Sequence, residues 1–226
     1  MIKKITSIVL ILGGILLMTN LAACSDHSTA RPKNRSEEEV QVEKAFQPLF
    51  AFLNQKEKDF SAVNTYVASI TYEDKQNNQK EEKSIVFNPL DLKAPKGTFS
   101  HIIQDNESKE EIAFEASQNK LNLKKTKAED LDFILNRSIE TEAIKKLGIV
   151  TSSKDHPETE LKTILYDKAP ESDLVDALME QYDIKDIKKS HLSLSENGKG
   201  NYKVQVSLRT NEKVYYMDLL IEMKAK

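Results

Sequence analysis

The sequence predicts an α+β fold, in which antiparallel sheets of short strands pack with a few helices, preceded by a signal peptide and a flexible tether. Some segments carry an apolar residue at every second position, as half-buried strands do, and others at every third or fourth, as amphipathic helices do. Short polar stretches separate most of the alternating segments, which favours antiparallel pairing of neighbours. The alternation is one-sided, so each sheet is expected to bury a single face.

Residues 1–23 have the features of an export signal. Lys3 and Lys4 give a positive start, and an apolar run follows from Ile5 to Met18. The run is about 14 residues long, whereas a helix that spans a bilayer needs about 20 apolar residues. The polar segment 25–27 ends it, which disfavours the alternative of a permanent membrane helix.

Cys24 is the only cysteine of the chain, and it ends the segment Leu21-Ala22-Ala23-Cys24. This segment resembles the lipobox of bacterial lipoproteins. The resemblance implies cleavage between Ala23 and Cys24, diacylglycerol on the thiol, fatty acyl chains such as palmitate, and a place on the extracytoplasmic face of the cell membrane. Each buried CH₂ group contributes about 0.8 kcal/mol, so two acyl chains would hold the protein durably. The alternative is a secreted protein with a stray cysteine near its cleavage site.

A lipidated Cys24 has consequences for the rest of the chain. It leaves no thiol for a disulfide, a nucleophile or a metal site. Residues 24–35 are the lipidated cysteine and a predicted tether, because the segment 25–35 has no apolar residue larger than alanine and contains Pro32. Loss of residues 1–23 removes Lys3 and Lys4 and no acid, so the net charge becomes more negative than the −3 of the full chain. A negative chain is not expected to bind nucleic acid.

The first half of the predicted domain, residues 36–226, reads as a helix followed by strands. Ser36 and Glu39 have the spacing of a capping box. Apolar residues at helical spacing continue to Leu53, and Pro48 is expected to kink or split this helix. Five alternating segments follow, and they run from Tyr66 to Tyr72, at Ile85 and Phe87, from Phe99 to Ile103, from Ile112 to Ala116, and at Leu121 and Leu123.

The second half repeats the order of helix before strands. A second capping box at 126–129 precedes a helical stripe from Leu131 to Leu147, and division into two helices at the segment 136–138 is the alternative. Residues 151–160 are polar. A strand at 161–166, a helix at 170–182 and strands around 192–194, 202–208 and 215–223 complete the pattern, with a turn at Asn197-Gly198. One domain is expected, and the segment 148–160 is the alternative boundary.

The pattern as a whole resembles the staphylococcal-type tandem lipoproteins, a Gram-positive family of surface proteins. The resemblance lies in the segments SEEEVQVEKAFQPLF, APKGTF, EIAFEASQNKLNL, SDLVDALMEQYDI, NGKGNYKVQV and VYYMDLLIEM. It implies an exported, lipid-anchored protein with no established enzymatic activity, some of whose relatives take part in host contact.

Candidate residues for chemistry are few. The four histidines are His27, His101, His156 and His191, and no two have the local spacing of metal ligands, so no metal or cofactor site is expected. His101 is expected to be half-buried in a strand. His156 lies in a polar segment, where a weak cation site is the alternative to a structural role. No phosphate-binding loop, dinucleotide fingerprint or nucleophile elbow is present, so no catalytic residue is assigned and the protein is not expected to be an enzyme.

Charged side chains are abundant and have ordinary explanations. The carboxylate pairs Asp130/Asp132 and Glu110/Glu111 are expected to be structural, with Asp130 favoured by the dipole of a helix N-terminus. The lysines at 185, 188 and 189 are expected to be solvated, and binding to an acidic polymer or phospholipid head groups is the alternative. Tyr215 is expected in the core.

These features predict a lipid-anchored, non-enzymatic surface lipoprotein that contacts macromolecules. Its expected partners are the membrane, through the lipid, and a protein or a component of the cell envelope. A ligand-binding lipoprotein that captures a small molecule or a cell-wall fragment is the alternative, and it would require a pocket with converging polar groups.

Overall fold

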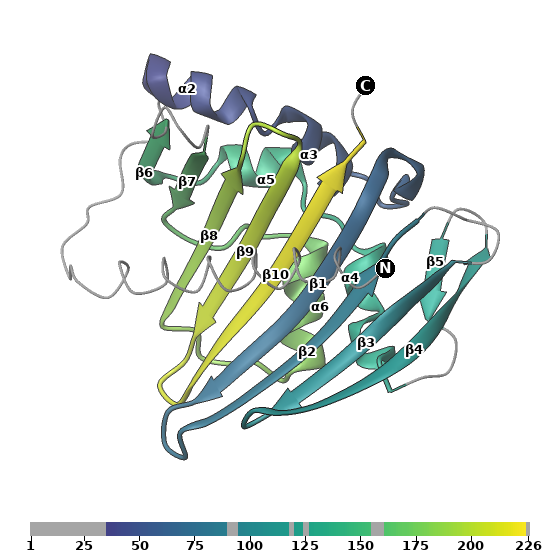
Figure 1. Cartoon of the computed structure of the whole chain (residues 1–226). Helices are drawn as coiled ribbons and strands as arrows, with labels where there is room; N and C mark the ends of the chain where they lie inside the picture. The colour runs from purple at the N-terminus through teal and green to yellow at the C-terminus, as the bar shows by residue number, and fades with distance from the viewer. Residues whose placement is uncertain (1–34, 90–94, 118–119, 124–126, 155–160, 225–226) are drawn as a thin grey trace.

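The computed structural model describes residues 35–89, 95–117, 120–123, 127–154 and 161–224, and the fold they form is a single large sheet (Figure 1). Ten antiparallel strands are ordered β5-β4-β3-β2-β1-β10-β9-β8-β7-β6. The predicted α+β class with separate sheet regions is therefore wrong: the fold is dominated by one continuous sheet with a few short helices. The physical reason is that the two predicted groups of strands pair with each other through β1 and β10.

The strands account for nearly half of the described chain. They are β1 (Val63–Asp74), β2 (Gln79–Phe87), β3 (Lys96–Ile103), β4 (Asn106–Ser117), β5 (Lys120–Leu123), β6 (Ile149–Lys154), β7 (Lys162–Tyr166), β8 (Lys189–Glu196), β9 (Asn201–Arg209) and β10 (Lys213–Met223). Strand β6 begins just before the polar segment 151–160, where no strand was predicted. It lies at the edge of the sheet and pairs only with β7.

The helices are short. They are α2 (Glu37–Lys44), α3 (Gln47–Leu53), α4 (Phe133–Asn136), α5 (Thr141–Lys145) and α6 (Asp173–Gln181), with 3₁₀ turns η2 (Phe60–Ala62) and η3 (Glu129–Leu131). Figure 1 shows α4 and α6 behind the sheet and α2 and α3 along one end of it. Among the described residues, no helix combines the length and the apolar character needed to cross a membrane.

The helix boundaries follow from local sequence. The predicted capping box at Ser36 and Glu39 is confirmed, since each residue bonds the backbone of the other. Pro48 lies in the first turn of α3 and separates it from α2, as predicted. The apolar stripe after Asp130 becomes η3, α4 and α5 instead of one or two regular helices. The break after Asn136 is where the sequence predicted a division.

The two faces of the sheet differ in chemistry. On the covered face, against the helices, lie residues such as Tyr66, Ile85, Phe87 and Val204, all fully buried. Phe60 lies between the rings of Tyr66 and Phe87, with ring centroids 5.4 Å and 5.5 Å away. On the opposite face no described helix packs, and we call it the uncovered face; there, serine, amide and charged residues dominate β8 and β9. The predicted one-sided alternation is therefore confirmed.

One glycine shows how tightly the covered face is packed. A Cβ atom at Gly97 would lie 2.4 Å from the carbonyl oxygen of Val86 and 3.0 Å from the ring of Phe114. Real Cβ atoms do not approach a backbone oxygen so closely, so any larger residue would push β2 and β3 apart. Gly97 thus allows the ring of Phe114 to lie across β3 and to reach Phe87, whose centroid is 4.7 Å away.

Candidate functional site

The residues predicted for lipidation lie outside the described part of the chain. Ala23, Cys24 and His27 belong to the segment before Arg35, and His156 falls in the undescribed segment 155–160. His101 is half-buried on the covered face, as predicted. His191 lies on β8 on the uncovered face, where its Nδ1 atom is buried and has no hydrogen-bond partner.

The other singled-out groups are described, and most make ordinary surface contacts. The Glu111 carboxylate lies 2.8 Å from Lys96 Nζ, and both side chains are largely exposed. Asp132 accepts a hydrogen bond from the backbone N–H of Leu123 at 2.9 Å. Lys185 pairs with the exposed Asp183 at 2.7 Å. Within the described ranges, no group of three or more histidine, aspartate or glutamate residues is arranged to hold a metal ion.

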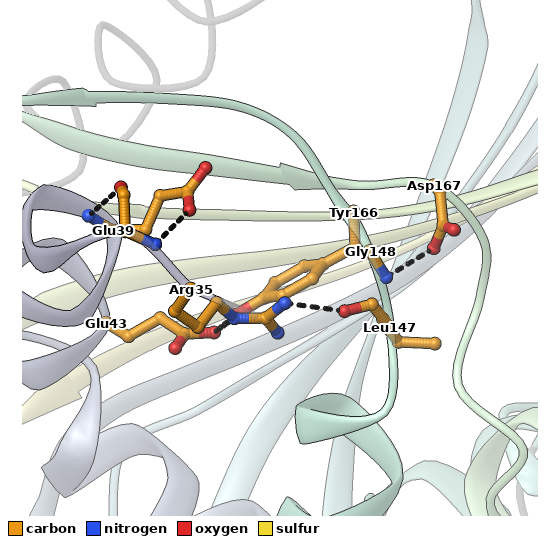
Figure 2. A network of polar contacts seen from close by, with 8 residues as sticks. Arg35, Glu39, Glu43, Leu147, Gly148, Tyr166 and Asp167 are labelled. Atoms are coloured by element: carbon orange, nitrogen blue, oxygen red, sulfur yellow. Dashed lines mark hydrogen bonds and ion pairs between the residues drawn. The ribbon is translucent and has the colours of Figure 1, made fainter. Parts of the chain in front are cut away.

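A first polar network holds the first described residue, Arg35, and helix α2 against the rest of the domain (Figure 2). Arg35, which the sequence pattern placed at the end of the tether, is part of the fold, and its side chain is only 11% exposed. Its Nε atom lies 3.1 Å from Glu43 Oε1, and Nη1 donates to the carbonyl oxygen of Leu147 at 2.8 Å. Tyr166 donates to the same Glu43 oxygen at 2.9 Å. We call these residues, Arg35, Glu43, Leu147 and Tyr166, the Arg35 clamp.

The Arg35 clamp joins three parts of the chain that are distant in sequence. Glu43 comes from α2, Leu147 follows α5, and Tyr166 ends β7. The guanidinium carbon lies 5.8 Å from the centroid of the Tyr166 ring, within cation–π range. Burial, and then the charge of Glu43, raises the pKa of Tyr166. The phenol therefore stays protonated and keeps donating to Glu43, which fixes where the chain enters the domain.

A second polar network lies on the covered face, where apolar side chains are the rule. We call it the tyrosine–carboxylate cluster, and its members are Tyr72, Glu81, Lys83, His101, Asp130, Tyr182 and Tyr215. Glu81 is at its centre: it accepts a hydrogen bond from Tyr72, and its Oε1 lies 2.8 Å from His101 Nε2. Lys83 Nζ lies 3.7 Å from Glu81 and 2.5 Å from Asp130 Oδ2.

Strand register brings five of these residues together. Tyr215, Tyr72 and Glu81 are direct partners across β10, β1 and β2. Lys83 and His101 are partners in the next row of the same face, across β2 and β3. Because side chains two residues apart on a strand share a face, the two rows form one continuous polar patch.

The last two residues come from the helical layer. Tyr182 follows α6, and its ring centroid lies 6.2 Å from that of Tyr215. Asp130 lies in η3. It lies in the first turn of this short helix, and one of its oxygens also accepts a hydrogen bond from Lys83 of β2.

The electrostatics of this cluster favour a charged Glu81 and neutral phenols. Burial opposes the charge of Glu81, but hydrogen bonds from Tyr72 and His101, with the charge of Lys83, outweigh it and lower the pKa of the carboxyl group. The hydrogen bond to Glu81, with burial, raises the pKa of Tyr72 to about 12. Tyr72 is therefore a poor base and a poor nucleophile at neutral pH.

Sequence reasoning did not assemble this cluster. His101, Asp130 and Tyr215 each have a separate structural explanation from the sequence. No role is predicted for Glu81 or Lys83. The one available signal was that Glu81, Lys83 and His101 keep the parity of the buried residues Ile85 and Phe99 on their own strands. Comparisons of the chain with known protein families and with curated proteins find no match.

Proposed function

We propose that this protein is a lipid-anchored lipoprotein on the extracytoplasmic face of the cell membrane. The observation that carries the proposal is the segment Leu21-Ala22-Ala23-Cys24, placed after a positive start and a short apolar run. In this proposal the chain is cleaved before Cys24, acyl chains on the thiol enter the bilayer, and the sheet domain stays outside it. The likeness to tandem lipoproteins in the quoted segments belongs to the same proposal.

The Arg35 clamp supports this arrangement. Arg35 is eleven positions after Cys24, and a fully extended chain covers at most about 3.6 Å per residue, so the domain would start within about 40 Å of the anchor. A force on the anchor would be transmitted to the domain at Arg35, whose side chain is 11% exposed and bonded to Glu43 and Leu147. A domain held in this way would keep one defined point nearest the membrane.

We further propose that the domain acts by binding, without catalysis, and contacts a macromolecule such as a protein or a component of the cell envelope. Two observations support this. The tyrosine–carboxylate cluster brings titratable groups together, but among the described residues the hydroxyl that bonds Glu81 is the phenol of Tyr72, and the pKa of that phenol is raised to about 12. On β8 and β9 the uncovered face presents a row of polar side chains, a surface available to a macromolecule.

The decisive experiment concerns Cys24. We would express the full chain and its Cys24→Ala variant in a Gram-positive host and separate membrane from soluble fractions. Wild-type protein should be in the membrane fraction, and its N-terminal fragment should carry diacylglycerol by mass spectrometry. Cys24→Ala should lose both properties, whereas the neighbouring variant Ser25→Ala should keep them. Equal membrane partitioning of wild type and Cys24→Ala would overturn the proposal.

Capture of a small ligand is a second candidate function, and one observation favours it. Two polar atoms of the tyrosine–carboxylate cluster, Asp130 Oδ1 and the Tyr182 hydroxyl, are buried and have no hydrogen-bond partner. Buried polar atoms in proteins almost always have partners, so this pair is a place where a ligand can add hydrogen bonds.

A further inference from the structure

The two unpartnered atoms, Asp130 Oδ1 and the hydroxyl oxygen of Tyr182, can both accept hydrogen bonds from a ligand. Asp130 Oδ2 is held by Lys83, but Oδ1 only accepts hydrogen bonds and has none. The hydroxyl of Tyr182 can accept as well as donate, and it also has none. A group with several N–H donors would serve both atoms, whereas a carboxylate or a phosphate would meet Asp130 with a like charge.

The charges around the site favour a cation. Two carboxylates, Glu81 and Asp130, share the single ammonium group of Lys83. Burial, then the charges of Asp130 and Glu81, raises the pKa of Tyr182. Burial, then Asp74 and Asp183, raises the pKa of Tyr215. Carboxylates therefore act on both phenols, and the cations of the same region are Lys83, beside Asp130, and Lys213, over the ring of Tyr72.

Three tyrosine rings of the cluster lie together. The rings of Tyr72 and Tyr182 both contact that of Tyr215, with centroids 6.1 Å and 6.2 Å from its own. Tyrosine faces attract cations within about 6 Å of the ring centroid. Lys213 Nζ already lies 5.6 Å from the centre of Tyr72, so a ring of this group accepts a cation in the folded protein.

We propose that the tyrosine–carboxylate cluster binds a small primary ammonium group, which donates hydrogen bonds to Asp130 Oδ1 and to the hydroxyl of Tyr182 beside the ring of Tyr215. This inference deepens the second candidate function and does not depend on the lipid anchor. The ammonium group is the shared chemistry of free alkylamines and of amino sugars, and the two sources are separated by the probes. A quaternary ammonium has the charge but no N–H donor, so it binds more weakly.

The test is a titration of the full-length protein in detergent micelles, followed by NMR of labelled tyrosine rings. The chain has seven tyrosines and no tryptophan, so the ring signals are few enough to assign by Tyr→Phe variants. Ethylammonium and glucosamine are the two primary-amine probes, tetramethylammonium is the probe without N–H groups, and sodium chloride controls for ionic strength. We expect saturable shifts in Tyr182 and Tyr215, and at least tenfold weaker binding of tetramethylammonium. Tighter binding of glucosamine than of ethylammonium would identify an amino sugar as the source, and the reverse a free amine.

Two variants and one control locate the site. Tyr182→Phe keeps the ring and removes one acceptor, so affinity should fall about tenfold, as expected for one hydrogen bond from a charged donor. Asp130→Asn removes the charge and should weaken binding more than tenfold. Tyr216→Phe removes a hydroxyl from the uncovered face of the same strand as Tyr215 and should change nothing.

The outcomes separate this inference from the proposed anchor. Membrane partitioning of Tyr182→Phe should equal that of wild type, because Cys24 is untouched. Shifts that do not saturate, that sodium chloride reproduces, or that survive in both Tyr182→Phe and Asp130→Asn with unchanged affinity would overturn the ammonium site and leave the anchor unaffected.

Discussion

The covered and uncovered faces are built from the same strands and yet obey different rules. On β2, Ile85 points to the helices and is fully buried, whereas its neighbour Val86 points to the other face and is partly exposed. On β9, Tyr202, Val204, Val206 and Leu208 are buried, and the residues between them are polar. Among the described residues, the apolar core therefore lies on the face that the helices cover. The tyrosine–carboxylate cluster is the place where polar side chains enter the covered face.

The largest effect that separates the two faces should come from neighbouring truncations on β2. Ile85→Ala leaves a cavity under the helices and should cost about 3 kcal/mol of unfolding free energy. Val86→Ala removes a smaller side chain with more access to water and should cost about 1 kcal/mol or less. Urea unfolding followed by circular dichroism measures both. Equal losses would mean that the uncovered face is packed as closely as the covered one.

The next effect concerns a buried charge in the segment between α3 and η2. Lys58 is 4% exposed, it donates a hydrogen bond to the carbonyl oxygen of Arg137, and burial lowers its pKa from 10.5 to about 8. Between these two values the unfolded chain binds more protons than the folded one, so stability rises with pH. The cost of the buried charge is fully present below pH 8 and disappears above the unfolded pKa.

A lysine-to-methionine variant isolates this charge. Between pH 7 and 9.5, wild type should gain about 2 kcal/mol relative to Lys58→Met, since the variant has no proton to release. The exposed Lys56→Met in the same loop should follow the wild-type curve. Thermal unfolding at several pH values measures the difference, and parallel curves for wild type and Lys58→Met would contradict the lowered pKa.

The smallest effect should come from an ion pair on the uncovered face. Lys203 Nζ lies 2.8 Å from Asp218 Oδ1, and both side chains are about one-fifth exposed. Gln205 also donates to Asp218, at 2.9 Å, so the carboxylate keeps a partner when the lysine is removed. Lys203→Met should therefore cost about 0.5 kcal/mol in low salt and almost nothing in 1 M sodium chloride. A loss above about 2 kcal/mol would show that this face contains a buried network.

The sequence predicted local elements well because their signals are local. The capping box at Ser36, the split at Pro48 and the alternation in β1, β9 and β10 each depend on residues a few positions apart. It failed for β6, whose residues Thr151 to Lys154 are polar because an edge strand buries little. It also failed for the fold class, because β1 and β10 are separated by more than a hundred residues and alternation does not specify a partner.

The two polar networks were unpredictable for the same reason. Arg35 follows a polar segment and looks like part of it, and its partners Leu147 and Tyr166 are distant in sequence. Glu81 meets Tyr72 through a hairpin register and meets Asp130 only through Lys83. Such contacts require the pairing of whole strands to be known first.

The pairing of β1 with β10 has a consequence for synthesis. The middle of the sheet is made by strands at opposite ends of the described chain, and Val63 lies opposite Met223. During translation, β1 therefore lacks its central neighbour until residues 213–223 have left the ribosome. Two incomplete half-sheets would exist until then, with β1 open to other molecules. Completion of this fold therefore requires a late, long-range pairing, and the chain stays incompletely folded until β10 is available.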